Sequence, residues 1–259
     1  MGKTEIIKDW ARSNYSSHRF FERSIKKNLS LRNLLGNVKL FFSSGEFRGI
    51  TYLKFFKSNE VHQTTPFTKM DRYPEIFSAC RDYLINKKDL KILSYGCSTG
   101  EEVLTLRKYF KDANIVGAEI NKNSLKVCRS HKIDNKIKFI ASRDSNIKKE
   151  GKFNLIFCMA VLQRTPHYVT SQGIKNIKDI YPFDKFEKKV NELDSYLNKG
   201  GIMVIHYSQY SFTDTEVSSK YMSLGNYNQD DYVTAIFDRD SNLIEKPISR
   251  NNIFLKLED

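Results

Sequence analysis

Short apolar segments alternate with longer amphipathic ones from residue 91 to the end of the chain. Runs rich in β-branched and aromatic residues predict strands over 91–95, 114–120, 136–141, 155–159 and 202–208. Apolar positions at helical spacing predict helices over 101–110, 122–130 and 183–197. Strands that alternate with helices in this way favour a parallel sheet with helices on both faces. Two alternating segments, 232–237 and 253–257, predict an antiparallel pair at its edge, so we expect an α/β fold with seven strands.

The first 60 residues differ from this pattern. Apolar positions at helical spacing between residues 3 and 35 predict one or two helices, and the stretch 38–57 fits either a helix or a short hairpin. We therefore expect a mainly helical extension over 1–60, packed as a lid on a core of 61–259. Pro66 and Pro74 shape the loop between the two, and a helix is expected over 75–85.

Composition sets the outer limits. A chain of 259 residues with 40% hydrophobic content can bury the core of one α/β domain with additions. No apolar run approaches the ~20 residues of a membrane span, and the first residues lack the apolar region of a signal peptide. The four cysteines form no CxxC motif, which predicts reduced thiols, no structural metal and a cytoplasmic enzyme.

The formal net charge of +13 admits two interpretations. A nucleic-acid binder concentrates its basic residues in one patch or run. Here the lysines are dispersed and rarely exceed pairs, so we do not expect a nucleic-acid partner. A basic cleft for a small phosphorylated or carboxylated substrate is the preferred interpretation, and the oligomeric state is left open.

The most informative segment is a small-residue loop, GCSTG at 96–100, that follows the first core strand. Glycine lets such a loop approach a ligand closely, because no Cβ intervenes. Glu101 and Glu102 then open a helix, and Glu119 comes near the end of the next strand, where it can accept both hydroxyls of a ribose. Two acids at the helix start would repel a pyrophosphate but suit an amino group and a sulfonium. This combination predicts S-adenosylmethionine as the cofactor.

Three motifs carry a family resemblance. GCSTGEE (96–102) resembles motif I of class I S-adenosylmethionine-dependent methyltransferases, and is most similar to the variant in the chemotaxis-receptor glutamate methyltransferases. FNLIFCMAVL (153–162) is similar to the fourth-strand motif of that class. LNKGGIMVI (197–205) is similar to its turn into the fifth strand, with Lys199 in place of the usual proline. The resemblance covers roughly residues 60–210 and implies a Rossmann-like fold with a mostly parallel seven-stranded sheet.

The resemblance also implies which residues contact the cofactor. Thr65 and Arg72 match the positions that contact its carboxylate end, although Arg72 could instead face the substrate. Asp144 follows the third strand, where the family places an acid near the adenine amino group. The full expected set is Thr65, Arg72, Gly96, Cys97, Ser98, Thr99, Gly100, Glu101, Glu102, Glu119, Ile120, Asp144 and Met159.

The residues that bind the methyl acceptor are predicted from weaker sequence signals than those that bind the cofactor. Methyl transfer needs alignment, and a base as well if the acceptor is a hydroxyl or a protonated amine. His167 and His206 lie near strand ends and are the expected bases. The long insertion 163–181 should border the acceptor. The residues expected to bind it are Arg164, Tyr168, Tyr207 and Tyr210.

Together these features predict a methyltransferase acting on oxygen or nitrogen of a small anionic metabolite or a surface-glycan precursor. Two alternatives stay open: modification of a macromolecule, either a receptor carboxylate or RNA, and cofactor binding without activity.

Overall fold

A computed structural model describes residues 45–57, 60–65, 67–227, 235–245 and 250–259. The chain divides into two compact units, residues 1–48 and Gly49–Asp259. The helices expected over 3–35 lie outside the described residues. Within the stretch for which helix and hairpin were both open, the structure has a helix, α3 (Gly45–Phe56). None of the described helices is long and apolar enough to cross a membrane.

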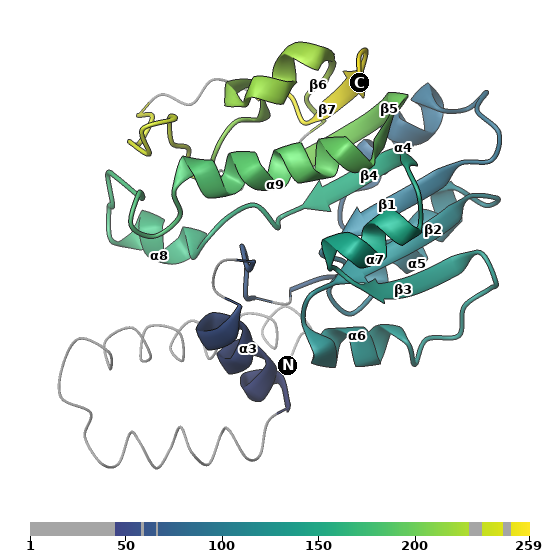
Figure 1. Ribbon diagram of the computed structural model, residues 1–259, viewed down its shortest axis with the longest axis horizontal. Coiled ribbons are helices and arrows are strands. Elements are labelled where there is room, and N and C mark those ends of the chain that lie inside the picture. Colours follow the sequence, from purple (N-terminus) through teal and green to yellow (C-terminus); the bar gives the residue numbers. More distant parts are fainter. Residues whose placement is uncertain (1–44, 58–59, 66, 228–234, 246–249) are drawn as a thin grey trace, which may run out of the picture. The chain divides into compact units, whose positions relative to one another are not determined.

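The larger unit is built on one seven-stranded sheet (Figure 1). Its strands are β1 (Lys91–Tyr95), β2 (Asn114–Glu119), β3 (Ile137–Ala141), β4 (Phe153–Met159), β5 (Leu197–His206), β6 (Tyr221–Gly225) and β7 (Ile253–Lys256). Their order in the sheet is β3-β2-β1-β4-β5-β7-β6. Strands β1 to β5 pair with one another in parallel. Strand β7 runs antiparallel to β5, and β6 runs antiparallel to β7. This confirms the Rossmann-like fold.

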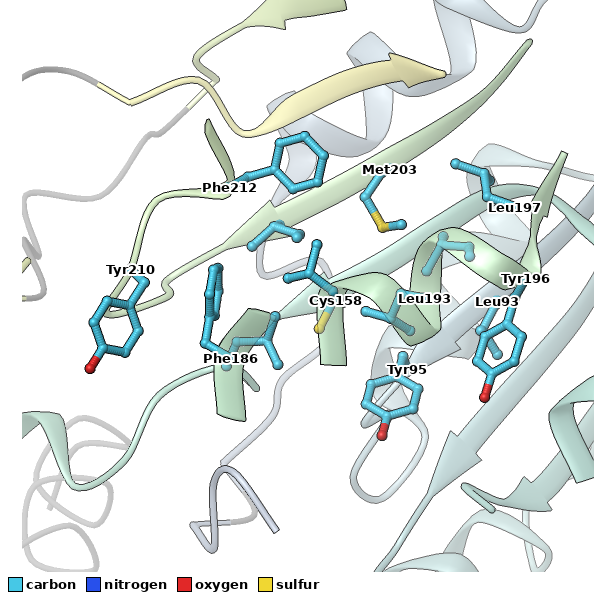
Figure 2. Packing of buried hydrophobic residues seen from close by; sticks show 14 of the residues in the cluster. Leu93, Tyr95, Cys158, Phe186, Leu193, Tyr196, Leu197, Met203, Tyr210 and Phe212 are labelled. Carbon is cyan, nitrogen blue, oxygen red and sulfur yellow. The ribbon is translucent and has the colours of Figure 1, made fainter. Parts of the chain in front are cut away.

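Helices cover both faces of the sheet. On one face lie α7 (Asp144–Lys149), α8 (Pro166–Ser171) and α9 (Phe183–Tyr196), whose apolar residues join those of the sheet in one buried cluster. Figure 2 shows Phe186 and Leu193 of α9 beside Leu93, Cys158 and Met203 of the strands. On the other face, α4 (Pro74–Tyr83), α5 (Glu101–Tyr109) and α6 (Lys122–Cys128) form a second cluster with the sheet.

The prediction for the sheet edge was wrong in one strand. The partner of β7 is β6 (Tyr221–Gly225), not the segment 232–237. Residues 232–234 of that segment lie outside the described residues, and Phe237 makes only an isolated bridge to Leu243. The segment 232–237 has the alternating pattern of an edge strand, but pairing with a distant strand decides which segment joins the sheet.

Two further differences concern the segments around β4 and β5. The insertion 163–181 contains a short helix, α8, which begins at Pro166 where a fixed φ suits the first helical turn. Strand β5 begins at Leu197, five residues before the expected 202, and takes in the Gly200–Gly201 turn as an irregularity in its pairing with β4. All four cysteines are free and buried, as expected.

Candidate active site

The ends of three strands converge on one cleft. Tyr95, Glu119 and Met159 are the last residues of β1, β2 and β4. The chain order reverses beside β1, with β2 on one side and β4 on the other, and open α/β sheets bind ligands at such a switch point. Two cavities, partly open to solvent, lie at this edge, a larger one of about 710 Å³ and a smaller one of about 350 Å³. Gly96, Ser98 and Met159 line both, so the cavities adjoin.

The loop after β1 turns tightly because of its small residues. Gly96 has φ +77°, and a Cβ built on it would lie 2.4 Å from Cγ2 of Val161. Ser98 also has a positive φ, of 52°. The Gly96 N–H donates to the carbonyl of Ala118 at 2.8 Å, which ties the loop to β2. Main-chain atoms of this loop can therefore approach a ligand in the cleft closely.

Glu119 is buried and lines the larger cavity. Its carboxylate accepts the backbone N–H of Ser98 at 2.9 Å and that of Asn121 at 2.6 Å. Burial raises the pKa of the Glu119 carboxyl to about 7, against the opposite effect of these backbone donors. The side chain is thus held rigidly at the end of β2, with remaining lone pairs for a ligand that supplies hydroxyl donors.

The smaller cavity brings an acid and a guanidinium together. Glu102, in the first turn of α5, and Arg72 both line it. The Ser94 hydroxyl donates to Glu102 Oε1 at 2.7 Å. Burial raises the pKa of Glu102 to about 7, while the Ser94 hydrogen bond and the charge of Arg72 act in the opposite direction. Arg72 lies over the rings of Phe67 and Tyr73, at 4.8 and 5.0 Å from their centroids. The smaller cavity can therefore hold a ligand group that carries one positive and one negative charge, with Glu102 facing the positive charge and Arg72 the negative one.

Most of the residues expected to bind the cofactor line these cavities. The larger cavity includes Thr65, Gly96, Ser98, Glu119, Ile120 and Met159, and the smaller one adds Arg72, Cys97 and Glu102. Thr99, Gly100 and Glu101 line neither cavity. The Thr99 hydroxyl donates to Glu101 Oε2 at 2.7 Å, and Gly100 is the N-cap of α5.

Asp144 is the fourth expected residue that lines neither cavity. It is the exposed first residue of α7, where its Oδ1 accepts the Tyr196 hydroxyl at 2.7 Å and its Oδ2 pairs with Lys148 at 3.0 Å. These two contacts hold the pKa of Asp144 below its usual range. The carboxylate lines neither cavity, and Ser142, two residues earlier, lines the larger one instead. The start of a helix at this point carries the side chain of Asp144 out of the cleft.

Neither histidine expected as a base lines the two cavities. His206, the last residue of β5, is buried behind Tyr73, with ring centroids 5.0 Å apart. His167 is exposed on α8. The histidine that does line the larger cavity is His62, which sequence reasoning missed. It precedes the core strands, and the available signal was its place in the loop before Pro66.

The residues expected to bind the acceptor do not line the two cavities either. Tyr210 is fully buried, where its hydroxyl donates to the Tyr181 carbonyl and is hydrogen-bonded to the Ser241 hydroxyl. Tyr207 is buried against His206, and Tyr168 is half-buried on α8. Arg164 lies nearest to the cleft, with Nη1 3.5 Å from the carbonyl oxygen of His62. Tyr210 is therefore part of the core, as Figure 2 shows.

Over the described part of the chain, no cluster of three or more His, Cys, Asp and Glu side chains could hold a metal ion. The groups that line the cleft include carboxylates, a guanidinium, an imidazole and the backbone of the glycine loop.

Solved structures similar to this chain include three methyltransferases or related proteins. The plantazolicin methyltransferase BpumL in complex with SAH is 16% identical with a TM-score of 0.37, covering 72% of this chain and 59% of that chain. The sugar N-methyltransferase KedS8 from Streptoalloteichus sp ATCC 53650 is 16% identical with a TM-score of 0.38, covering 55% and 51%. Monomeric WbdD is 21% identical with a TM-score of 0.37, covering 54% and 32%. The chain spans less than two thirds of each of these structures.

No curated protein matches the chain. A family model described as a methyltransferase domain matches residues 86–251, which takes in β1 to β5, the glycine loop, Glu102 and Glu119. Because this match covers more than half of the chain, the protein belongs to the methyltransferase-domain family.

Proposed function

We propose that this methyltransferase binds S-adenosylmethionine across the two adjoining cavities and transfers its methyl group to a small anionic acceptor. The observation that carries the proposal is the buried carboxylate of Glu119, held by two backbone donors at the end of β2. Ribose hydroxyls supply the donors that such a carboxylate needs. When bound, the cofactor supplies a methyl group on a positively charged sulfur.

The smaller cavity suits the other end of the same molecule. The amino acid portion of S-adenosylmethionine carries an ammonium, which Glu102 can bind, and a carboxylate, which Arg72 can bind by paired hydrogen bonds. The loop residues Gly96 and Ser98 lie between the two halves and present backbone to the ligand. One extended ligand with a diol at one end and both charges at the other therefore fits the chemistry of the whole cleft.

The preference for an anionic acceptor rests on the charges around His62. Lys185, Lys189 and Arg164 all act electrostatically on this residue, which lines the larger cavity. The three cations do not line the cavity, whose own lining includes Glu60 and Glu119, but their charge acts through the wall that His62 forms and favours a phosphorylated or carboxylated substrate. The test measures transfer of a labelled methyl group to phosphorylated sugars, hydroxy acids, a glutamate-rich receptor fragment and RNA. The substrates that become labelled distinguish a small anionic acceptor from the macromolecular alternatives.

The test of the cofactor site is the variant Glu119→Gln. Wild-type protein should bind S-adenosylhomocysteine with roughly micromolar affinity, about −8 kcal/mol. The variant should lose tenfold or more, because hydrogen bonds to a charged group contribute about 1.5–3 kcal/mol. Isothermal titration calorimetry measures both. The matched control is Asp144→Asn, the same change at an acid that lies outside the cleft, and its affinity should stay within twofold. Unchanged affinity in Glu119→Gln would sink the assignment.

Binding should also depend on pH. The pKa values of Glu102 and Glu119 are raised to about 7, so both carboxyls are largely protonated below neutral pH, whereas the ligand is bound by their ionised forms. Raised pKa values also mean that the ligand-free protein loses stability as pH rises from about 4.5 to about 7. Affinity should therefore rise about tenfold per carboxylate between about pH 6 and pH 8, with proton release on binding.

Calorimetry in buffers of different ionisation enthalpy counts the protons released. Glu119→Gln should remove about half of the pH dependence, since one of the two carboxyls is gone. An affinity that stays flat across this range would mean that neither acid meets the ligand in its ionised form.

A further inference from the structure

The larger cavity extends beyond the part that the ribose occupies under the proposed function. It runs from Ser142 after β3, past Glu119 of β2, to Met159 and Val161 at the end of β4. Strands β2 and β4 flank β1, and because neighbouring strands lie about 4.8 Å apart, β2 and β4 are about 10 Å apart. A ribose bound by Glu119 therefore leaves the β4 end of this cavity for another group.

His62 lies at that β4 end. Its segment is attached to residues that follow β4 in the chain, since Nη1 of Arg164 lies 3.5 Å from the His62 carbonyl oxygen. Lys185 donates to the Val61 carbonyl at 2.7 Å, and Nδ1 of His62 lies 2.6 Å from the hydroxyl of Tyr181. These contacts hold the imidazole on the side of the cavity away from the ribose.

The hydroxyl of Tyr181 fixes the proton on the His62 ring. Tyr181 is fully buried, and within the described part of the chain Nδ1 of His62 is the one hydrogen-bond partner of its hydroxyl. A buried O–H group needs an acceptor, so this hydroxyl donates to Nδ1. The carbonyl of Tyr181 accepts the Tyr210 hydroxyl, which holds Tyr181 in place. His62 therefore carries its proton on Nε2, because a neutral imidazole has one donor and one acceptor nitrogen.

The ring is neutral as well as fixed. The pKa of His62 is lowered well below its usual value by burial and then by three cations, Lys185, Lys189 and Arg164. The acids Glu60 and Glu119 line the same cavity as the ring. At neutral pH the imidazole thus offers the cavity one N–H group and no positive charge.

Nε2 is accessible to a ligand in the cavity. It makes no hydrogen bond to any group that the structure describes, and it is not among the described side-chain atoms that are both buried and without a partner. Since His62 lines the larger cavity, that is where its Nε2–H opens. The wall beside it is apolar, with Val61, Met159 and Val161, and a hydrogen bond is stronger in such surroundings than in water.

We propose that the Nε2–H of His62 binds an oxygen atom of the methyl acceptor at the β4 end of the larger cavity. Carboxylate, phosphate and hydroxyl oxygens all have a lone pair for this donor, whereas a protonated amine presents only N–H groups and is disfavoured. The ring orients the acceptor and takes up no proton from it. Tyr181 acts through His62 and is a positioning residue. This inference rests on the proposed function and narrows its acceptor to one that presents oxygen.

The tautomer of His62 is measured first, in the full chain saturated with S-adenosylhomocysteine. Nitrogen-15 labelling of the histidines distinguishes protonated from bare ring nitrogens, and His62→Gln identifies the signals of this residue. At neutral pH we expect a proton on Nε2 and none on Nδ1. A proton on Nδ1, or a doubly protonated ring, overturns the proposal.

A second variant tests the positioning role of Tyr181. Tyr181→Phe should spread the ring proton over both nitrogens of His62, because Nδ1 loses its donor. The matched control is Tyr83→Phe, which removes a hydroxyl from an exposed residue of α4 and should leave the His62 signals unchanged. A tautomer that does not respond to loss of the Tyr181 hydroxyl contradicts the positioning role.

A titration of the same complex tests whether the donor binds oxygen. The probes are sodium acetate and inorganic phosphate, and the comparisons are methylamine hydrochloride and sodium chloride at matched pH and ionic strength. We expect acetate or phosphate to shift the Nε2–H signals of His62 until they saturate, and neither comparison to do so. If neither anion shifts these signals, or if methylamine shifts them equally, the proposal is overturned.

Two variants separate acceptor binding from cofactor binding. His62→Phe removes the donor, whereas His62→Gln keeps an N–H near the position of Nε2. On an anionic acceptor that the wild type methylates, His62→Phe should raise KM about tenfold or more, because a hydrogen bond to a charged oxygen is lost, and His62→Gln should recover part of this. The affinity of both variants for S-adenosylhomocysteine should be unchanged, because the ring lies away from the ribose and amino acid contacts.

The outcomes distinguish this inference from the proposed function. Equal losses of acceptor and S-adenosylhomocysteine affinity in His62→Phe contradict a role in binding the acceptor. Absence of S-adenosylhomocysteine binding in the wild type overturns the proposed function instead. Circular dichroism checks that both variants fold, and the titration of the wild type decides the matter by itself if one does not.

Discussion

Replacing Gly96 with alanine should weaken the binding of S-adenosylhomocysteine strongly. The new Cβ would lie 2.4 Å from Cγ2 of Val161, at a residue whose φ of +77° already disfavours any side chain. Left-handed strain and overpacking together cost about 2–5 kcal/mol. The clash can be relieved only if the loop or the Val161 side chain moves, and Gly96 and Val161 both line the larger cavity. We expect affinity to fall by about a hundredfold or more, which calorimetry measures.

The control for this variant is Gly151→Ala. Gly151 has φ +78°, almost the same as Gly96, but a Cβ there would meet nothing within 4 Å. The backbone strain is therefore shared and the clash is not. Gly151→Ala should lower the free energy of unfolding by about 1–2 kcal/mol and leave the affinity for S-adenosylhomocysteine unchanged. If both variants bind equally well, close approach of the loop is not what shapes the cleft.

Lys256→Met should cause a large loss of stability. Lys256 of β7 is 2% exposed, and its Nζ lies 2.9 Å from Oδ1 of Asp194 in α9. It also donates to the carbonyls of Asp194 and Leu197 at 3.0 and 3.3 Å. Removal of one partner leaves the other buried charge uncompensated, at a cost of about 3–5 kcal/mol. Urea unfolding followed by circular dichroism measures the change.

An exposed lysine provides the matched comparison. Lys175 pairs with Glu245 at 3.5 Å, and both side chains are mostly in solvent. Lys175→Met should change the free energy of unfolding by less than about 1 kcal/mol, because surface pairs contribute little. The double variant Lys256→Met with Asp194→Leu should recover part of the loss, although the Tyr221 hydroxyl then loses its acceptor. Equal effects of the two single lysine changes would mean that burial of the Lys256 pair does not matter.

The local pattern of apolar and polar residues predicted much of the fold. Strand β1 has the bounds expected from its apolar run, and α5, β2 and α9 end within one residue of the expected positions. These elements can be predicted from the sequence because burial on one or both faces imposes a short-range period on the apolar positions. The glycine loop and Glu119 could be placed for the same reason, since each directly follows or ends a buried strand.

The wrong or missed predictions share a different cause, which is contact between residues that are far apart in the chain. His62 and Tyr181 are 119 residues apart, and no local pattern shows that they meet. Strand β6 joins the sheet through β7, about 30 residues later, whereas the sequence pattern had favoured 232–237 for that place. Asp144 follows β3 as expected, but the helix that starts there carries its side chain to Tyr196 and Lys148.

The amino-acid sequence by itself therefore determined the α/β alternation, the strands whose ends build the cleft and the carboxylates that follow or end them. These depend on hydrophobic period and on residues next to strand ends, which are properties of neighbours in the chain. Only the tertiary structure decided which histidine borders the cleft, which tyrosines are core, and which segment closes the sheet edge. Those outcomes depend on packing between distant segments, whose free energy is shared among many contacts and leaves no signature at any one position.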